Sequence, residues 1–190
     1  MNISDQVVLI TGGAGQVGRT IIADLQGATR GLVVLDRDQE GLSDLVHEYP
    51  GIQAYVCELG DFDGVQNTME QVFADGNRVS VLLNNAGYIH SEPMINLLSA
   101  DAKMHRPTTW QATINNNLHT TFYSTACCVE RMVTNRIRGL VINISSIAAA
   151  GNIGQSAYSA AKAGVNALTP IWSQEFSMFG IRCAAIAPGF

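Results

Sequence analysis

Three side chains that can take part in proton transfer stand among alanines, glycines and isoleucines in residues 144–164, ISSIAAAGNIGQSAYSAAKAG. Two of them, Tyr158 and Lys162, are four residues apart, so on a helix they lie on one face with Cβ atoms about 5–6 Å apart. A tyrosine acts as an acid or base near neutral pH only when its pKa falls from about 10, which takes about 4 kcal/mol, and an ammonium about 5 Å away supplies about 3 kcal/mol. The pair therefore indicates a tyrosine acid–base group supported by a lysine.

The third side chain, Ser145, ends the apolar run GLVINIS at 139–145, which predicts a strand. Side chains at the carboxyl ends of strands in an open α/β sheet face the ligand crevice, and a hydroxyl there can bind a substrate oxygen. We therefore expect hydride transfer at a carbon that bears an oxygen, with the proton passing through Tyr158. A tyrosine–lysine pair is also common in ordinary helices, so this interpretation depends on the other motifs.

A glycine loop supplies the second motif, TGGAGQVGRT at 11–20, in which Gly13, Gly15 and Gly18 match G-x-G-x-x-G between a strand-like run and a helix-like stretch. Asp36 follows 18 residues after Gly18, at the end of the next apolar run. This context is typical of a dinucleotide site, where the glycines let the backbone approach a pyrophosphate. Asp36 would accept hydrogen bonds from the ribose and repel a 2′-phosphate, which favours NAD. Arg37 would partly offset that repulsion, so NADP is the alternative.

Short apolar runs alternate with helix-compatible stretches along the whole chain. Because the runs are apolar at nearly every position, they predict strands covered on both faces, and the alternation predicts a doubly wound parallel α/β sheet of the Rossmann type. We expect a single domain over residues 1–190 that carries both the cofactor and the catalytic residues. The expected strands are 7–11, 31–36, 52–57, 79–85, 139–145 and 181–187; the expected helices are 15–27, 38–48, 61–75, 108–136 and 155–179.

Composition limits the function classes. The 190 residues are 47% hydrophobic and 14% charged, as in a globular domain, and the net charge of −5 provides no basic field for nucleic acid. With no basic N-terminal segment and no apolar run of about 18 residues, we expect a soluble cytoplasmic protein without a membrane partner. The four cysteines are interpreted as reduced thiols, and the spacing of the four histidines suggests no metal site.

Taken in order, these motifs resemble those of the short-chain dehydrogenases/reductases, and within that family the 3-oxoacyl-carrier-protein reductase group. The resemblance rests on TGGAGQVG, NNAG at 84–87, NNL at 116–118, Ser145 thirteen residues before Tyr158, YSAAK, and the final PGF. It implies an NAD(P)-dependent oxidoreductase that acts on CH–OH groups and interconverts a secondary alcohol and a ketone. It also implies a homodimer or homotetramer formed through two long helices.

The resemblance assigns roles to individual residues. Ser145, Tyr158 and Lys162 would be catalytic, together with Asn117, which would kink a helix and hold a water in a proton relay. Asn84 would border the adenosine side and stabilise the sheet, and Lys162 would bind the nicotinamide ribose. The residues expected to bind the cofactor are Gly12, Gly15, Gln16, Val17, Gly18, Asp36, Arg37, Glu58, Leu59, Asn85, Ala86, Gly87, Tyr158, Lys162, Pro188 and Gly189; those expected to bind the substrate are Ser145, Gly151, Asn152, Gln155 and Tyr158.

Some positions depart from the family pattern. Gln16 stands where this branch has a glycine, Glu58 stands where an aspartate is common, and the sequence stops at Phe190, where the family continues with a segment that covers the substrate. We therefore expect a fragment. The Gly15 spacing is closer to the branch that modifies sugar nucleotides, so an epimerase-like enzyme is one alternative. A catalytically silent NAD-binding regulatory or scaffold protein is the other.

Overall fold

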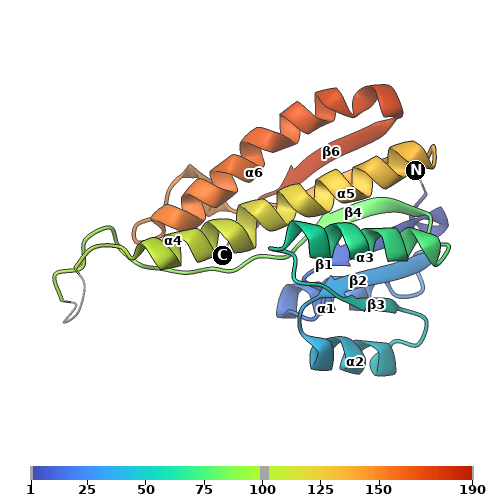
Figure 1. The fold of residues 1–190 in the computed structure, drawn as a ribbon, viewed down its shortest axis with the longest axis horizontal. Coiled ribbons are helices and arrows are strands. Elements are labelled where there is room, and N and C mark those ends of the chain that lie inside the picture. The colour runs from blue at the N-terminus through green and yellow to red at the C-terminus, as the bar shows by residue number, and fades with distance from the viewer. Residues whose placement is uncertain (1, 99–102, 190) are drawn as a thin grey trace.

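A six-stranded parallel sheet forms the centre of the computed structural model, which describes residues 2–98 and 103–189 (Figure 1). Phe190, the last residue of the PGF motif, lies outside the described residues. The strands run in the order β3-β2-β1-β4-β5-β6, and every pairing is parallel. The strands are β1 (Val7–Thr11), β2 (Gly31–Asp36), β3 (Gln53–Val56), β4 (Val79–Asn84), β5 (Gly139–Ile144) and β6 (Ile181–Ile186).

Helices cover both faces of this sheet, as the alternation of elements predicts, and the expected fold class is confirmed. Short 3₁₀ turns, η1 (Ile3–Asp5), η3 (Ile147–Ala150) and η4 (Ser177–Phe179), stand at element ends. The helices are α1 (Gln16–Leu25), α2 (Gln39–Glu48), α3 (Phe62–Ala74), α4 (Pro107–Ile114), α5 (Thr120–Thr134) and α6 (Ser156–Glu175).

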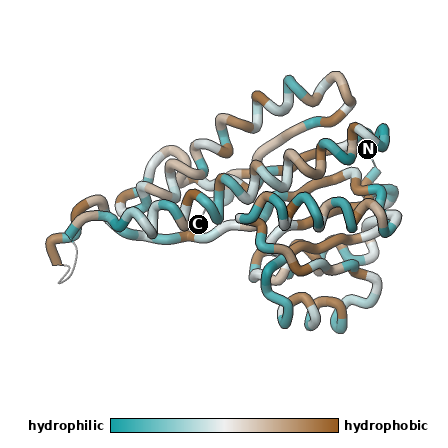
Figure 2. The backbone as a smooth tube through the Cα atoms, in the orientation of Figure 1, coloured by the Kyte–Doolittle hydropathy of each residue, from teal (hydrophilic) through white to brown (hydrophobic). Residues whose placement is uncertain are grey.

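Two apolar clusters lie on opposite faces of the sheet because successive side chains of a strand point to opposite sides. On β1, Leu9 belongs to the cluster under α3 and α5, whereas Val8 and Ile10 belong to the cluster under α1 and α2. Figure 2 shows the central strands as mostly hydrophobic and the outer turns of the helices as more hydrophilic. Coverage on both faces explains why β1, β2 and β4 have no polar–apolar alternation, whereas the edge strands β3 and β6 are largely exposed.

The prediction of one regular helix over residues 108–136 is wrong. The structure divides it into α4, a π-helical turn, η2 (Asn115–His119), and α5. Single π turns inside helices lie frequently at functional sites. The expected helix over 155–179 is shorter as well, since α6 ends at Glu175 and the chain passes through η4 to Gly180, which has a left-handed φ of 72°.

The irregular stretch between β4 and α4 forms an arm, defined here as residues 94–98 and 103–105. An antiparallel bridge joins Ile95 to Met104, and the His105 N–H donates to the Met94 carbonyl at 2.9 Å. The arm projects beyond α4, away from the sheet (Figure 1). Leu97 and Leu98, 75% and 96% exposed, therefore cover no part of the sheet.

Candidate active site

The loops at the carboxyl ends of the strands enclose a cleft of about 780 Å³, which lies within the usual range for small-molecule sites. The cleft spans the point where the strand order reverses, between β1 and β4, which is where ligands bind in such sheets. All the residues expected to bind the cofactor line it, and so do four of those expected to bind substrate: Ser145, Asn152, Gln155 and Tyr158. Of the residues expected to bind substrate or to take part in catalysis, Gly151 and Asn117 do not line the cleft.

Tyr158 and Lys162 lie in the first two turns of α6, on one face, as their spacing predicts. The Lys162 Nζ is 5.8 Å from the centre of the Tyr158 ring and donates a hydrogen bond to the Ile144 carbonyl at 2.8 Å. Both side chains are buried, and burial lowers the pKa of Lys162 to about 8. An ammonium with this pKa is mostly charged at neutral pH yet gives up its proton readily.

Ser145 is placed by the pairing of β5 with β6, since its N–H donates to the Ile186 carbonyl at 2.7 Å. The residue is buried and lies at the cleft with Tyr158 and Lys162. Its Oγ is 3.5 Å from the Lys162 carbonyl, at the outer limit of a hydrogen bond. The hydroxyl is therefore weakly held within the protein and free to bind a substrate oxygen.

Asn117 is fully buried in the π turn and binds the loop that follows β4. Its Nδ2 donates to the Tyr88 carbonyl at 2.8 Å and to the Thr113 carbonyl at 2.9 Å, while its Oδ1 accepts from the Tyr88 N–H at 3.1 Å. Asn117 lies in the π turn, where the regular helix is interrupted. The water that Asn117 would hold stays a prediction.

Gly87 lies between these groups. A Cβ at this position would be 2.9 Å from the Asn117 Oδ1 and 3.4 Å from the Lys162 Nζ. Because even an alanine methyl would crowd the asparagine, the glycine permits the close approach of the loop to Asn117 and Lys162.

The glycine loop is held by close packing. Gly12 has a φ of 67°, and a Cβ on Gly18 would lie 2.4 Å from the Gly12 carbonyl oxygen. Gly15, by contrast, caps the start of α1, and a Cβ there would lie 3.4 Å from the Gly12 carbonyl oxygen, with no side chain within 4 Å. The first N–H groups of α1 have no partner within the helix and lie at the cleft, which suits an anion such as a pyrophosphate. Gln16 is exposed, so its side chain does not disturb the loop.

Asp36 is fixed by two backbone groups. Its Oδ2 accepts from the Ala14 N–H at 2.9 Å, and its Oδ1 accepts from the Asp38 N–H at 3.1 Å. A carboxylate has about four acceptor sites, so capacity remains for ribose hydroxyls. Arg37 is 3.6 Å from Glu58 in an ion pair in which both side chains are more than half exposed, so the attraction is weak.

The two asparagines of NNAG have structural contacts. Asn84 donates to the Thr125 hydroxyl at 2.8 Å and to the Asn143 side chain at 2.9 Å, inside the sheet. Asn85 donates to the carbonyls of Thr11 and Gly12 at 3.1 and 3.0 Å. Asn84 therefore joins β4 to β5 and α5, and Asn85 joins the end of β4 to the glycine loop.

Sequence reasoning missed several residues of the cleft. Tyr88 directly follows NNAG, and that position is the signal that could have identified it. Asn116 and Thr120 come from the π turn and the start of α5, where a regular helix was expected. The missed lining residues are Ala14, Asp38, Cys57, Tyr88, Ile89, Asn116, Thr120, Ile144, Ser146, Ile147 and Ala148.

Two further findings apply to the part of the chain that the structure describes. Its helices include none that is long and apolar enough to span a membrane. Its histidine, cysteine, aspartate and glutamate side chains form no group of three that could hold a metal ion.

Comparison with known proteins gives a consistent result. A family model described as short chain dehydrogenase matches residues 6–190. A 3-oxoacyl-(acyl-carrier-protein) reductase of Thermotoga maritima is 34% identical, over all of this chain and 76% of that protein. A (3R)-3-hydroxyacyl-CoA dehydrogenase of Homo sapiens is 31% identical, over 97% of this chain and 72% of that protein. The crystal structure of a short chain dehydrogenase from Bacillus anthracis superposes with a TM-score of 0.87 at 28% identity, over 98% of this chain and 74% of that one.

Proposed function

The chain belongs to the short-chain dehydrogenase family, whose members are oxidoreductases acting on CH–OH groups, and we propose that it interconverts a secondary alcohol and a ketone with NAD as the preferred cofactor. One observation carries the proposal. Ser145, Tyr158 and Lys162 line the same cleft as the glycine loop and Asp36.

The chemistry follows from the surroundings of each side chain. The Ser145 hydroxyl, only weakly held, binds the substrate oxygen and orients it. Tyr158 removes the hydroxyl proton during oxidation and returns it during reduction. Lys162, with Nζ held on the Ile144 carbonyl 5.8 Å from the tyrosine ring, stabilises the phenolate charge. Bound NAD(P) supplies or accepts the hydride at the carbon that bears this oxygen.

The cleft fits a dinucleotide. The start of α1 presents N–H groups for the pyrophosphate beside Gly15, where no side chain intrudes. The fixed carboxylate of Asp36 supports a preference for NAD, because it accepts ribose hydroxyls and repels a 2′-phosphate. Arg37 favours NADP, and its ion pair with Glu58 reduces that contribution.

Relatives suggest the first substrates to try. Their names describe enzymes acting on 3-oxoacyl and 3-hydroxyacyl thioesters, and one relative at 28% identity is a sorbitol-6-phosphate 2-dehydrogenase. We propose 3-oxoacyl thioesters as probes. A cytoplasmic location, a homo-oligomeric state and a single domain over residues 1–190 remain parts of the proposal.

The test begins with fluorescence titrations of the protein with NADH and NADPH, followed by turnover assays with acetoacetyl-CoA and the tighter-binding cofactor. Tighter NADH binding with turnover supports the proposal. Equal or tighter NADPH binding contradicts the cofactor preference. Binding without turnover of any alcohol or ketone in a panel supports the alternative of a catalytically silent NAD-binding protein.

A further inference from the structure

Tyr88 lines the cleft without a role in the proposed chemistry. It follows Gly87, whose position is fixed by the approach to Asn117 and Lys162. The backbone N–H and carbonyl of Tyr88 both form hydrogen bonds with the Asn117 side chain, so the backbone of Tyr88 is fixed in position. The tyrosine lines the cleft and is nevertheless 49% exposed, so part of the residue is accessible to a ligand.

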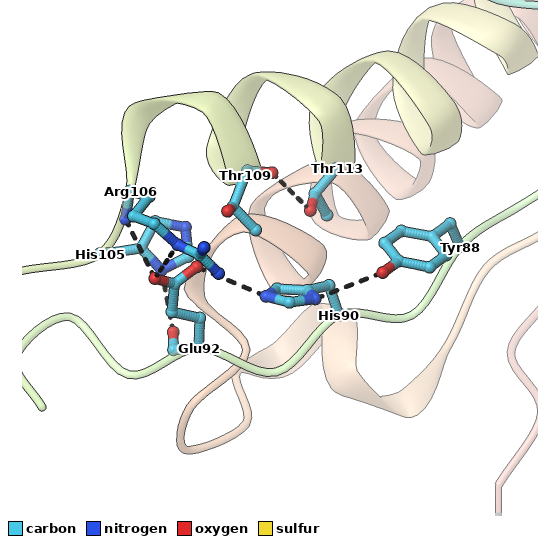
Figure 3. Close-up of polar contacts among 7 residues, drawn as sticks. All are labelled: Tyr88, His90, Glu92, His105, Arg106, Thr109 and Thr113. Atoms are coloured by element: carbon cyan, nitrogen blue, oxygen red, sulfur yellow. Dashed lines mark hydrogen bonds and ion pairs between the residues drawn. The ribbon is translucent and has the colours of Figure 1, made fainter. Parts of the chain in front are cut away.

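The far end of this ring is held by His90. The two rings are stacked, with centres 6.0 Å apart and planes 21° apart, and the Tyr88 hydroxyl lies 3.4 Å from the His90 Nδ1. Figure 3 shows the histidine between Tyr88 and Glu92.

His90 in turn lies beside Glu92, with its Nε2 3.4 Å from the glutamate Oε2. Both of these atoms are buried, and neither forms a hydrogen bond within the described part of the chain. Burial raises the pKa of Glu92, but hydrogen bonds from the Arg106 N–H and guanidinium and from the Thr109 hydroxyl outweigh it, so that the pKa is about 2. The glutamate is therefore a fixed anion beside the histidine.

These contacts form a closed series around the start of α4. Arg106 precedes the first residue of α4 and donates to the Glu92 Oε1 from its N–H at 3.2 Å and its Nε at 3.1 Å. The helix α4 continues into the π turn that carries Asn117, and Asn117 binds Tyr88. The position of the Tyr88 ring thus depends on contacts at its backbone and at its hydroxyl.

The surroundings of the ring indicate what it contacts. Ile89, next to Tyr88 in the chain, and Ile147, two residues after Ser145, also line the cleft and are 64% and 47% exposed, so the cleft presents apolar side chains in addition to the reacting groups. Such surface binds the apolar part of a ligand. A ketone held by Ser145 would place one of its substituents against this surface.

Resting on the proposed function, we propose that Tyr88 is a substrate-contacting residue that packs on the apolar substituent of the ketone, and that His90 is the positioning residue that fixes its ring. Loss of a contact made equally in the ground and transition states raises KM and leaves kcat unchanged. The geometry therefore assigns Tyr88 and His90 to substrate affinity and specificity and not to the chemical step.

The test measures kcat and KM for acetoacetyl-CoA and 3-oxooctanoyl-CoA with saturating cofactor. Tyr88→Ala raises KM about tenfold for the longer thioester and less for the shorter, with kcat within about twofold. Tyr88→Phe raises KM less than Tyr88→Ala does, because the ring is kept and only the hydroxyl contact with His90 is lost. His90→Ala raises KM in the unaltered protein but has no further effect in the Tyr88→Ala background, because its role acts through the tyrosine. His47→Ala, on the exposed side of α2, is the matched control.

Thermal unfolding and NADH affinity are measured for each variant, so that a folding defect is distinguished from a local effect. Unchanged KM in Tyr88→Ala overturns the contact, and equal effects of His90→Ala in both backgrounds overturn the positioning role. If the unaltered protein turns over neither thioester, the proposed function fails and this inference fails with it. Turnover with an unshifted KM defeats the inference alone.

Discussion

Lys162 donates a hydrogen bond from Nζ to the Ile144 carbonyl at 2.8 Å, while the whole residue is 3% exposed. A carbonyl dipole replaces only part of the hydration that an ammonium has in water, so the charged form is destabilised. Burial therefore lowers the pKa of Lys162 to about 8. The buried, charged Lys162 therefore lowers the free energy of unfolding.

The first prediction concerns that cost. Because the pKa of Lys162 is about 8 in the folded protein and 10.5 as its ordinary value, the unfolded chain binds more protons between these pH values, and stability rises with pH in this window. Below pH 8 the full penalty is present. Chemical denaturation of the unaltered protein and of Lys162→Met from pH 7 to 10 should show the unaltered protein gaining up to about 3 kcal/mol relative to the variant. A pH-independent difference between the two would contradict the buried ammonium.

The second prediction concerns the acid–base group. Tyr158→Phe removes the hydroxyl and keeps the ring, so turnover should fall at least about a hundredfold while NADH affinity stays within about twofold. Steady-state assays and nicotinamide fluorescence measure the two quantities. Tyr49→Phe, outside the cleft, is the matched control. Substantial turnover by Tyr158→Phe would exclude the assigned role.

The third prediction separates the charges that set cofactor preference. Asp36→Ala removes the repulsion of a 2′-phosphate and should lower NADH affinity about tenfold while improving NADPH binding relative to NADH. Glu58→Gln removes the partner of Arg37 and should strengthen NADPH binding a few-fold at low salt with little change for NADH. Titrations of both variants with both cofactors test this. NADPH binding that is insensitive to Glu58→Gln would show that Arg37 does not reach the phosphate.

The inner strands β1, β2 and β4 could be predicted closely from sequence because helices cover both of their faces, which makes apolar runs the direct signature of each strand. The π turn could not be predicted in this way. Asn115, Asn116 and Asn117 are compatible with a helix, and the turn coincides with hydrogen bonds from Asn117 to Tyr88, 29 residues away in the sequence. Periodicity contains no information about such a contact.

The same distinction applies to the site. Tyr158 and Lys162 could be found because their relation is local, one turn apart on one helix. The series of contacts from Tyr88 through His90 and Glu92 to Arg106 could not be found in this way. Glu92 and Arg106 are 14 residues apart in the sequence, and they meet only because the chain between them reverses direction, as the bridge between Ile95 and Met104 shows. Burial then decides which of these side chains interact, and residue type alone does not reveal burial.

The last prediction tests the close approach at Gly87. An alanine methyl there would lie 2.9 Å from the Asn117 Oδ1 and 3.4 Å from the Lys162 Nζ, so Gly87→Ala should cost about 1–3 kcal/mol of unfolding free energy. It should also lower kcat, because the proposed mechanism requires Lys162 to support the tyrosine. Gly31→Ala is the matched control, since its methyl would meet the Val7 side chain at ordinary contact distances of 3.8–3.9 Å. Urea denaturation and turnover assays compare the two variants. Equal stability and activity in both would mean that the loop after β4 shifts freely, and the fixed relation between Gly87, Asn117 and Lys162 would then not be required for the reaction.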